Sequence, residues 1–94
     1  MARRNDDIDA AWAEYAQRVA TSLRRIREQA GLSQEDVAYR AGMTRYTYQK
    51  YEKGESRPGT PANPTLRAML ALAQVLDVPL DALVPEPTPD LRNR

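Results

Sequence analysis

Apolar residues recur every three or four positions over about residues 7–30, which is the period of an amphipathic helix. They are Ile8, Trp12, Tyr15, Val19, Leu23, Ile26 and Ala30. Gly31 follows, and glycine readily takes the left-handed conformation in which helices commonly end. The pattern predicts one long helix at the start of the chain.

Two shorter helices are predicted directly after it. Ser33 and Asp36 form a capping-box pattern, which predicts a helix over about residues 34–41 that Gly42 ends. Thr44 is a favourable cap for a third helix that runs to about Lys53, before a third glycine at position 54. Each of the first three predicted helices is thus followed by glycine.

The composition changes to Ser, Arg, Pro, Gly and Thr over residues 55–62, which predicts an exposed loop. Asn63 and Pro64 then form a strong helix start, a cap followed by proline at the first helical position. A broad stripe of apolar residues follows and is predicted to be buried: Leu66, Met69, Leu70, Leu72, Ala73 and Leu76. This fourth helix is predicted to belong to the core.

Residues 79–84 are long enough for one more short helix. Prolines at positions 85, 87 and 89 predict that the last ten residues form an extended tail. No alternation typical of strands is visible, so the predicted fold class is all-α.

The second and third predicted helices are separated by only Gly42, Met43 and Thr44, so they must meet at a steep angle. Ala38 is small where the helices would cross, and Gly42 suits a turn with positive φ. The positions that would face the core are apolar or aromatic: Val37, Ala41, Met43, Tyr48 and Tyr51. The joint pattern predicts a helix-turn-helix.

Ninety-four residues suit one domain, and the absence of cysteine and histidine excludes thiol nucleophiles, Ser-His-Asp triads and the usual zinc sites. The carboxylates are scattered and no phosphate-binding loop is present, so neither an enzyme nor a cofactor or metal is expected. No apolar run reaches the roughly 18 residues of a membrane span, and residues 1–9 are polar. We therefore expect a cytoplasmic protein without membrane contact.

The net charge of +1 hides a basic middle of the chain. Residues 18–67 carry ten Arg and Lys against five Asp and Glu, whereas the segments on either side are both acidic. A basic region of this kind suits a polyanionic partner.

The outer side of the third predicted helix carries Arg45, Tyr46, Gln49 and Lys50 without an acid, unlike an ordinary solvated helix. Arginine can pair with guanine, glutamine with adenine, and tyrosine can contact a thymine methyl group. These four residues are therefore predicted to contact the bases of double-stranded DNA. Phosphate contacts are predicted for Gln34, Thr44, Lys53 and Arg57.

Three stretches of the chain are informative together: LRRIREQAGLSQEDVAYRAG from Leu23, YEKG from Tyr51 and NPTLRAMLALAQVLDVPLDALV from Asn63. With them, residues 20–84 resemble the XRE family of phage repressor and Cro-like helix-turn-helix regulators. The resemblance implies a five-helix, lambda-repressor-like domain whose third helix enters the major groove, with Gln34 on a phosphate. It also implies a homodimer and a structural ion pair between Arg27 and Glu52.

The chain departs from the family in two places, and both affect the expected organisation. The loop over residues 57–63 is longer than usual, and helix one is extended before Leu23. We therefore expect an extension over residues 1–19, a DNA-binding domain over 20–84 and a proline-rich tail over 85–94. In the extension, Trp12, Tyr15 and Val19 either pack on the last helix near residues 80 and 83 or form a dimer contact.

Three functions agree with the sequence. The first is a transcriptional regulator on a pseudo-palindromic operator, with no small-molecule effector expected because no residues remain for an effector domain. The second is an antitoxin that binds DNA and holds a partner protein by its tail or its first helix. The third is a protein-interaction module on the same fold, which the Arg, Gln and Lys face argues against.

Overall fold

The computed structural model describes residues 3–93. Its elements are α1 (Arg3–Gln29), α2 (Gln34–Arg40), α3 (Arg45–Lys53), β1 (Glu55–Arg57), β2 (Thr60–Pro61), α4 (Leu66–Leu76) and α5 (Leu80–Leu83). The predicted five-helix fold with a long first helix is confirmed.

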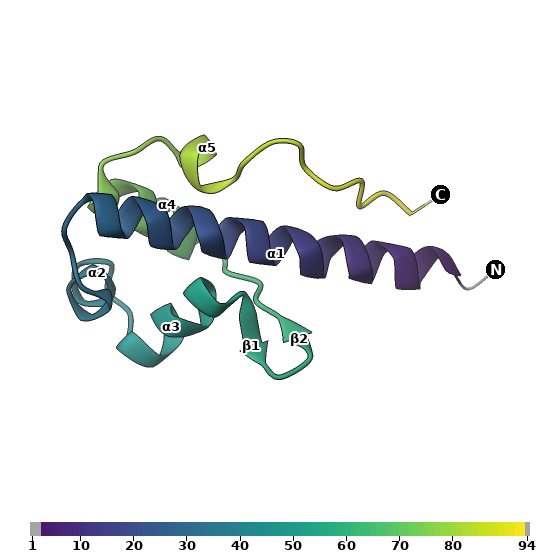
Figure 1. Ribbon diagram of the computed structural model, residues 1–94, viewed down its shortest axis with the longest axis horizontal. Helices are drawn as coiled ribbons and strands as arrows, with labels where there is room; N and C mark the ends of the chain where they lie inside the picture. Colours follow the sequence, from purple (N-terminus) through teal and green to yellow (C-terminus); the bar gives the residue numbers. More distant parts are fainter. Residues whose placement is uncertain (1–2, 94) are drawn as a thin grey trace.

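Helix α1 determines the shape of the molecule. Its 27 residues correspond to a length of about 40 Å, close to the longest dimension of 46 Å. In Figure 1, α2, α3 and the two strands lie below this helix, and α5 and the C-terminal segment lie above it. The first turns of α1 extend past the other helices, and the C-terminal segment runs toward the same end of the molecule.

The core contains one fully buried large side chain from each helix. These side chains are Leu23, Val37, Tyr48, Leu72 and Leu83, each less than 2% exposed. Neither α2 nor α5 is long enough to be a stable helix alone, because isolated helices of that length are marginal in water. The shared core therefore holds the short helices in place.

Most predicted helix boundaries agree with the structure, but two predictions for α4 are wrong. One is the start of the helix, and the other is the burial of Leu66 and Leu70, which are 67% and 41% exposed. Asn63 and Pro64 do not cap this helix; the cap is Thr65, whose Oγ1 accepts a hydrogen bond from the Ala68 amide at 3.0 Å. Thr65 has the extended conformation that capping requires, so the hydroxyl rather than the Asn63 side chain satisfies a free amide of the first turn.

The all-α prediction missed a small hairpin within the predicted loop. Strands β1 and β2 pair antiparallel, with Glu55 opposite Pro61 and Arg57 opposite Thr60. The strands have three and two residues, which is too short for any alternation to be visible in the sequence. The Ala62 amide also donates to the Gly54 carbonyl at 2.9 Å, so the hairpin is closed at its base.

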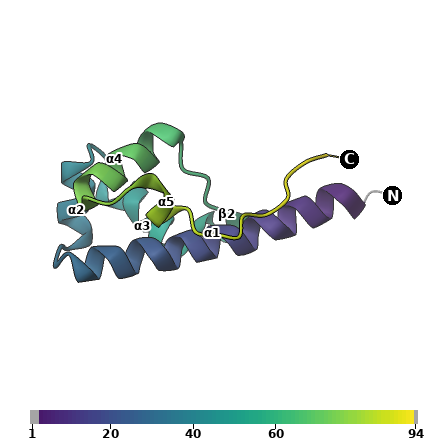
Figure 2. The same cartoon turned by 90° about the horizontal axis from the view of Figure 1, so that it is seen from above.

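Residues 85–93 form no helix or strand, as their prolines predict, but this C-terminal segment is attached to α1 (Figure 2). The Tyr15 hydroxyl donates to the Pro85 carbonyl at 2.9 Å. The Arg18 guanidinium donates to the carbonyls of Glu86 and Pro87 at 2.7 and 2.6 Å. Backbone carbonyls of the segment are thus held by α1 side chains.

The apolar stripe of the α1 extension lies largely inside the molecule. Tyr15 and Val19 are 5% and 9% exposed and belong to the same buried cluster as Leu83. Trp12 is half-buried, and its indole N–H donates to the Ala62 carbonyl at 3.2 Å. The chain's own elements therefore cover most of this stripe.

We expect Gly54→Ala to destabilise the fold more than Gly42→Ala does. Both glycines have φ near +75°, which costs any residue with a side chain about 1–2 kcal/mol. A Cβ at Gly42 would meet nothing within 4 Å, whereas one at Gly54 would lie 2.5 Å from Gln17 Nε2, which donates to the Lys53 carbonyl. Equal losses of unfolding free energy in urea titrations would contradict this account.

Candidate nucleic-acid interface

Helices α2 and α3 form a helix-turn-helix, and a side chain caps the amino end of each helix. Ser33 Oγ accepts from the Asp36 amide at 3.0 Å, completing the capping box, and Thr44 Oγ1 accepts from the Thr47 amide at 3.0 Å. In the turn, the Met43 amide donates to the Ala38 carbonyl at 2.9 Å. Ala38 is 1% exposed, as expected of a small residue at a tight crossing.

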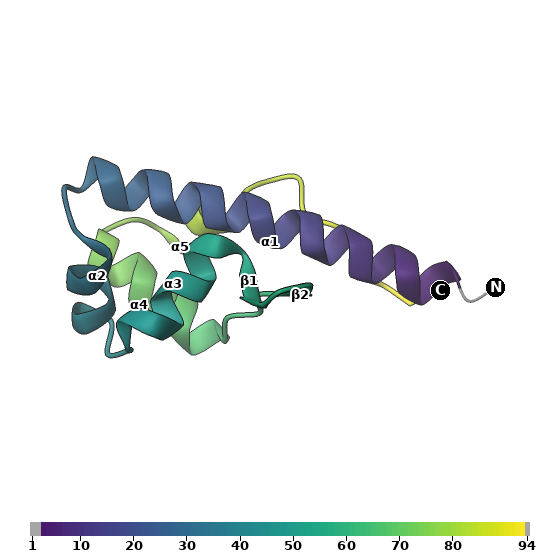
Figure 3. The ribbon, with the colours of Figure 1, turned by 60° about the horizontal axis from the view of Figure 1, so that its bottom comes forward.

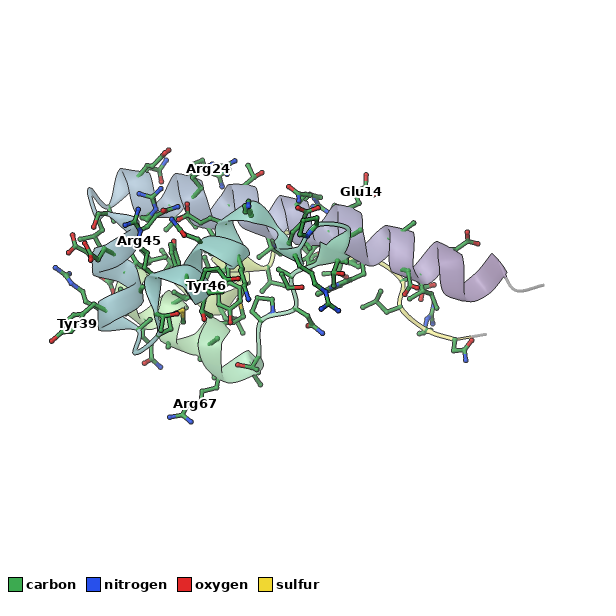
Figure 4. The ribbon with its side chains drawn as sticks, turned by 90° about the horizontal axis from the view of Figure 1, so that it is seen from below. Glu14, Arg24, Tyr39, Arg45, Tyr46 and Arg67 are labelled. Carbon is green, nitrogen blue, oxygen red and sulfur yellow. The ribbon has the colours of Figure 1, made fainter. Side chains whose placement is uncertain are left out.

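Helix α3 has a buried face and an exposed face. Tyr48 is fully buried, while Arg45 is exposed and Tyr46 is 69% exposed. Gln49 and Lys50 are half-buried on the outer side, and the Lys50 ammonium lies 4.4 Å from the Tyr46 ring centroid. Figures 3 and 4 show α3 at the front of the molecule, with Arg45 and Tyr46 along it. All four predicted base-contact residues thus lie on the exposed part of one helix.

A groove of about 510 Å³ lies beside this face. Its lining comes from α1, α3, β1 and the start of α2. Its cationic side chains are Arg24, Arg27, Lys50, Lys53 and Arg57, against the two acids Glu52 and Glu55. The excess of positive charge suits a polyanion.

Three of the four residues predicted to contact phosphates lie near the two ends of α3, whereas Gln34 is the first residue of α2. Thr44 is the N-cap of α3, and Lys53 is its last residue. Arg57 ends strand β1, four residues later, and the side chains of Lys53 and Arg57 are both exposed. Gln34 is engaged within the chain, because its Nε2 donates to Glu52 Oε1 at 3.0 Å and its Oε1 accepts from Gln49 Nε2 at 3.2 Å. A phosphate contact by Gln34 stays a prediction.

Behind the exposed face, the Glu52 carboxylate is 4% exposed and accepts hydrogen bonds from three side chains. Arg27 donates through Nε at 2.5 Å and Nη2 at 3.1 Å, and Gln34 and the Tyr48 hydroxyl complete the set. Arg27 also donates to the Leu32 carbonyl at 3.0 Å. The carboxylate thereby links α1, α2 and α3.

The protonation states in this cluster follow from its contacts. Burial alone would raise the pKa of Glu52, but hydrogen bonds from Arg27, Tyr48 and Gln34 outweigh it and lower the pKa. Burial and the hydrogen bond to Glu52 raise the pKa of Tyr48 far above its ordinary value, and the same carboxylate raises the pKa of Arg27. At neutral pH the cluster is therefore an ion pair with a neutral tyrosine donor.

Two α1 side chains that sequence reasoning missed bind the last carbonyls of α3. Gln17 Nε2 donates to the Lys53 carbonyl at 2.9 Å, and Arg24 Nη1 donates to the Glu52 carbonyl at 3.2 Å. Spacings of seven and three residues place Gln17, Arg24 and Arg27 on one face of α1. This helical spacing could have indicated the two residues, because Arg27 was already expected to pair with Glu52 of α3 and therefore places the same face of α1 against that helix.

A comparison with protein-family models matches residues 18–86 to a helix-turn-helix domain. The chain belongs to this helix-turn-helix family. Searches of the curated proteins and of the solved structures gave no match. Members of the family are DNA-binding domains and are typically not enzymes. Within residues 3–93, no helix is long and apolar enough to cross a membrane.

We expect the stability difference between the wild type and Glu52→Gln to depend on pH. The folded-state pKa of Glu52 lies below its ordinary value of 4.5. The stabilisation that ionised Glu52 provides is therefore complete above pH 4.5, and it is lost as the pH falls through the folded-state pKa. Urea titrations should thus give a larger difference at about pH 7 than at about pH 3. A difference that stays constant would contradict the assignment of an ionised Glu52.

Proposed function

We propose that the protein is a transcriptional regulator of the XRE type that binds specific sequences of double-stranded DNA. The observation that carries the proposal is the exposed face of α3, with Arg45, Tyr46, Gln49 and Lys50, beside a groove with excess positive charge. Such a role would be carried out inside the cell.

The dimensions of α3 suit the major groove. An α-helix with its side chains is about 10–12 Å across, and the major groove of B-DNA is about 12 Å wide, so the groove admits one helix. The nine residues of α3 give it a length of about 14 Å. With α3 in the groove, Arg45 near its amino end would reach base edges. Thr44 at one end and Lys53 and Arg57 at the other would meet the backbone on either side.

We also expect a homodimer on a pseudo-palindromic site, because one short helix contacts too few base pairs to specify a genomic site. Trp12, Tyr15 and Val19 were expected either to pack within the chain or to form the dimer contact. Trp12 is the most exposed of them. The dimer contact is therefore proposed for the Trp12 end of the stripe.

An antitoxin would need a segment free to hold its partner. Here the tail is hydrogen-bonded to Tyr15 and Arg18. On the first helix, the Trp12 indole donates to the Ala62 carbonyl. These contacts favour a regulator that acts on DNA without a partner protein.

Selection from random double-stranded DNA tests the proposal. We expect a pseudo-palindrome whose half-sites lie about 10 base pairs apart, bound by two chains in sedimentation. Recovery of no preferred sequence would contradict the proposal, and a site without dyad symmetry bound by one chain would contradict the dimer.

Two substitutions separate base contacts from phosphate contacts. Arg45→Ala should cost about 1–3 kcal/mol on the selected site and relax discrimination at one base pair, with less effect on random DNA. Lys53→Ala should weaken binding to all sequences alike and make the salt slope shallower by about one unit. Fluorescence anisotropy at several salt concentrations measures both effects. Equal loss on specific and random DNA for Arg45→Ala would make Arg45 a phosphate contact instead.

A further inference from the structure

A second hollow, with a volume of about 390 Å³, lies between α1, the inner side of α3, the start of α4 and the C-terminal segment. It shares no lining residue with the cationic groove. Trp12, Tyr15 and Tyr51 supply aromatic walls, and Met69 and Val84 supply aliphatic ones. Volumes of about 300–1,000 Å³ with mostly apolar walls are typical of sites for small molecules.

The chemistry of the lining restricts what can bind. None of its residues is charged, so a bound ion would lose its hydration without gaining a partner. The Trp12 N–H and the Tyr15 hydroxyl already donate to backbone carbonyls. The Tyr51 hydroxyl makes no hydrogen bond to any residue that the structure describes, and burial raises its pKa, so it stays a neutral donor. The lining therefore suits an uncharged, largely apolar molecule with at most a polar group or two.

The C-terminal segment covers part of this hollow. Pro89 and Leu91 belong to the lining, and the segment runs beside α1 (Figure 2). Arg18 holds it through the carbonyls of Glu86 and Pro87, and these bonds are exposed to solvent. A helix from another protein, about 10 Å across, would need an open groove, so the partly covered space favours a small molecule.

We propose that this hollow is a binding site for a small, uncharged aromatic or aliphatic molecule, with residues 85–91 as its cover. The α1 extension, the helix-turn-helix domain and the C-terminal segment form the site together, so it needs no separate effector domain. This proposal departs from the expectation that no small-molecule effector binds. No local sequence pattern could indicate such a site, because its walls come from residues far apart in the chain.

The test uses the full chain and N-phenyl-1-naphthylamine, a neutral aromatic probe whose fluorescence rises in apolar surroundings. We expect saturable binding of one probe per chain. Ala16→Leu places a larger side chain in the hollow and should weaken binding at least about tenfold. Ala13→Leu, the same change one turn earlier on α1 and outside the lining, is the matched control and should leave binding unchanged.

A second pair of variants tests the cover and substitutes no lining residue. Arg18→Ala removes both hydrogen bonds to the segment and should speed release of the probe, whereas Arg25→Ala, exposed on the same helix, should not. Absence of saturable binding by the folded wild type would overturn the proposal. Unchanged binding by folded Ala16→Leu would do the same. So would sedimentation in which dimer formation excludes the probe, because the dimer contact proposed at Trp12 would then occupy the hollow.

Discussion

The buried carboxylate of Glu52 is the constraint on which the arrangement of the first three helices depends. A carboxylate out of water is tolerated only when it is paired and its oxygens accept hydrogen bonds. Here the donors come from three elements, Arg27 on α1, Gln34 on α2 and Tyr48 on α3. Moving any one helix would leave the charge incompletely paired, and removing one partner of such a pair costs about 3–5 kcal/mol.

The buried carboxylate also restrains the exposed face of α3. Gln34 donates a hydrogen bond to Glu52 and accepts one from Gln49, so Gln49 on the outer side of α3 is linked to the buried cluster. At the carboxyl end, Gln17 and Arg24 bind the final carbonyls, and Thr44 caps the amino end. Helix α3 is therefore fixed at its start, middle and end before any ligand binds, which lowers the ordering cost of binding.

The parts of this fold that could be predicted from the sequence are those determined by neighbours in the chain. The Ser33 capping box, the Thr44 cap and the glycine after α3 each act over a few residues, so α2 and α3 were predicted closely. The hairpin and the attachment of the tail depend on residues far apart, such as Trp12 with Ala62 and Arg18 with Pro87. No local pattern contains that information.

The candidate site shows the same division. Helical spacing grouped Arg45, Tyr46, Gln49 and Lys50, because one helix carries them all. Gln17 and Arg24 were missed because their role appears only when α1 lies against the end of α3.

Helices α1 and α3 both contribute to two hollows of opposite character, and helical periodicity explains how they can. On α1, Arg24 and Arg27 line the cationic groove, whereas Trp12, Ala16 and Val19 line the apolar one. On α3, Lys50 and Lys53 face the groove, while Tyr51, between them in sequence, faces the apolar hollow. Residues one apart on a helix point about 100° apart, so adjacent positions serve different surfaces. Helical periodicity thereby separates the cationic side chains of the groove from the apolar hollow, which has no charged residue in its lining.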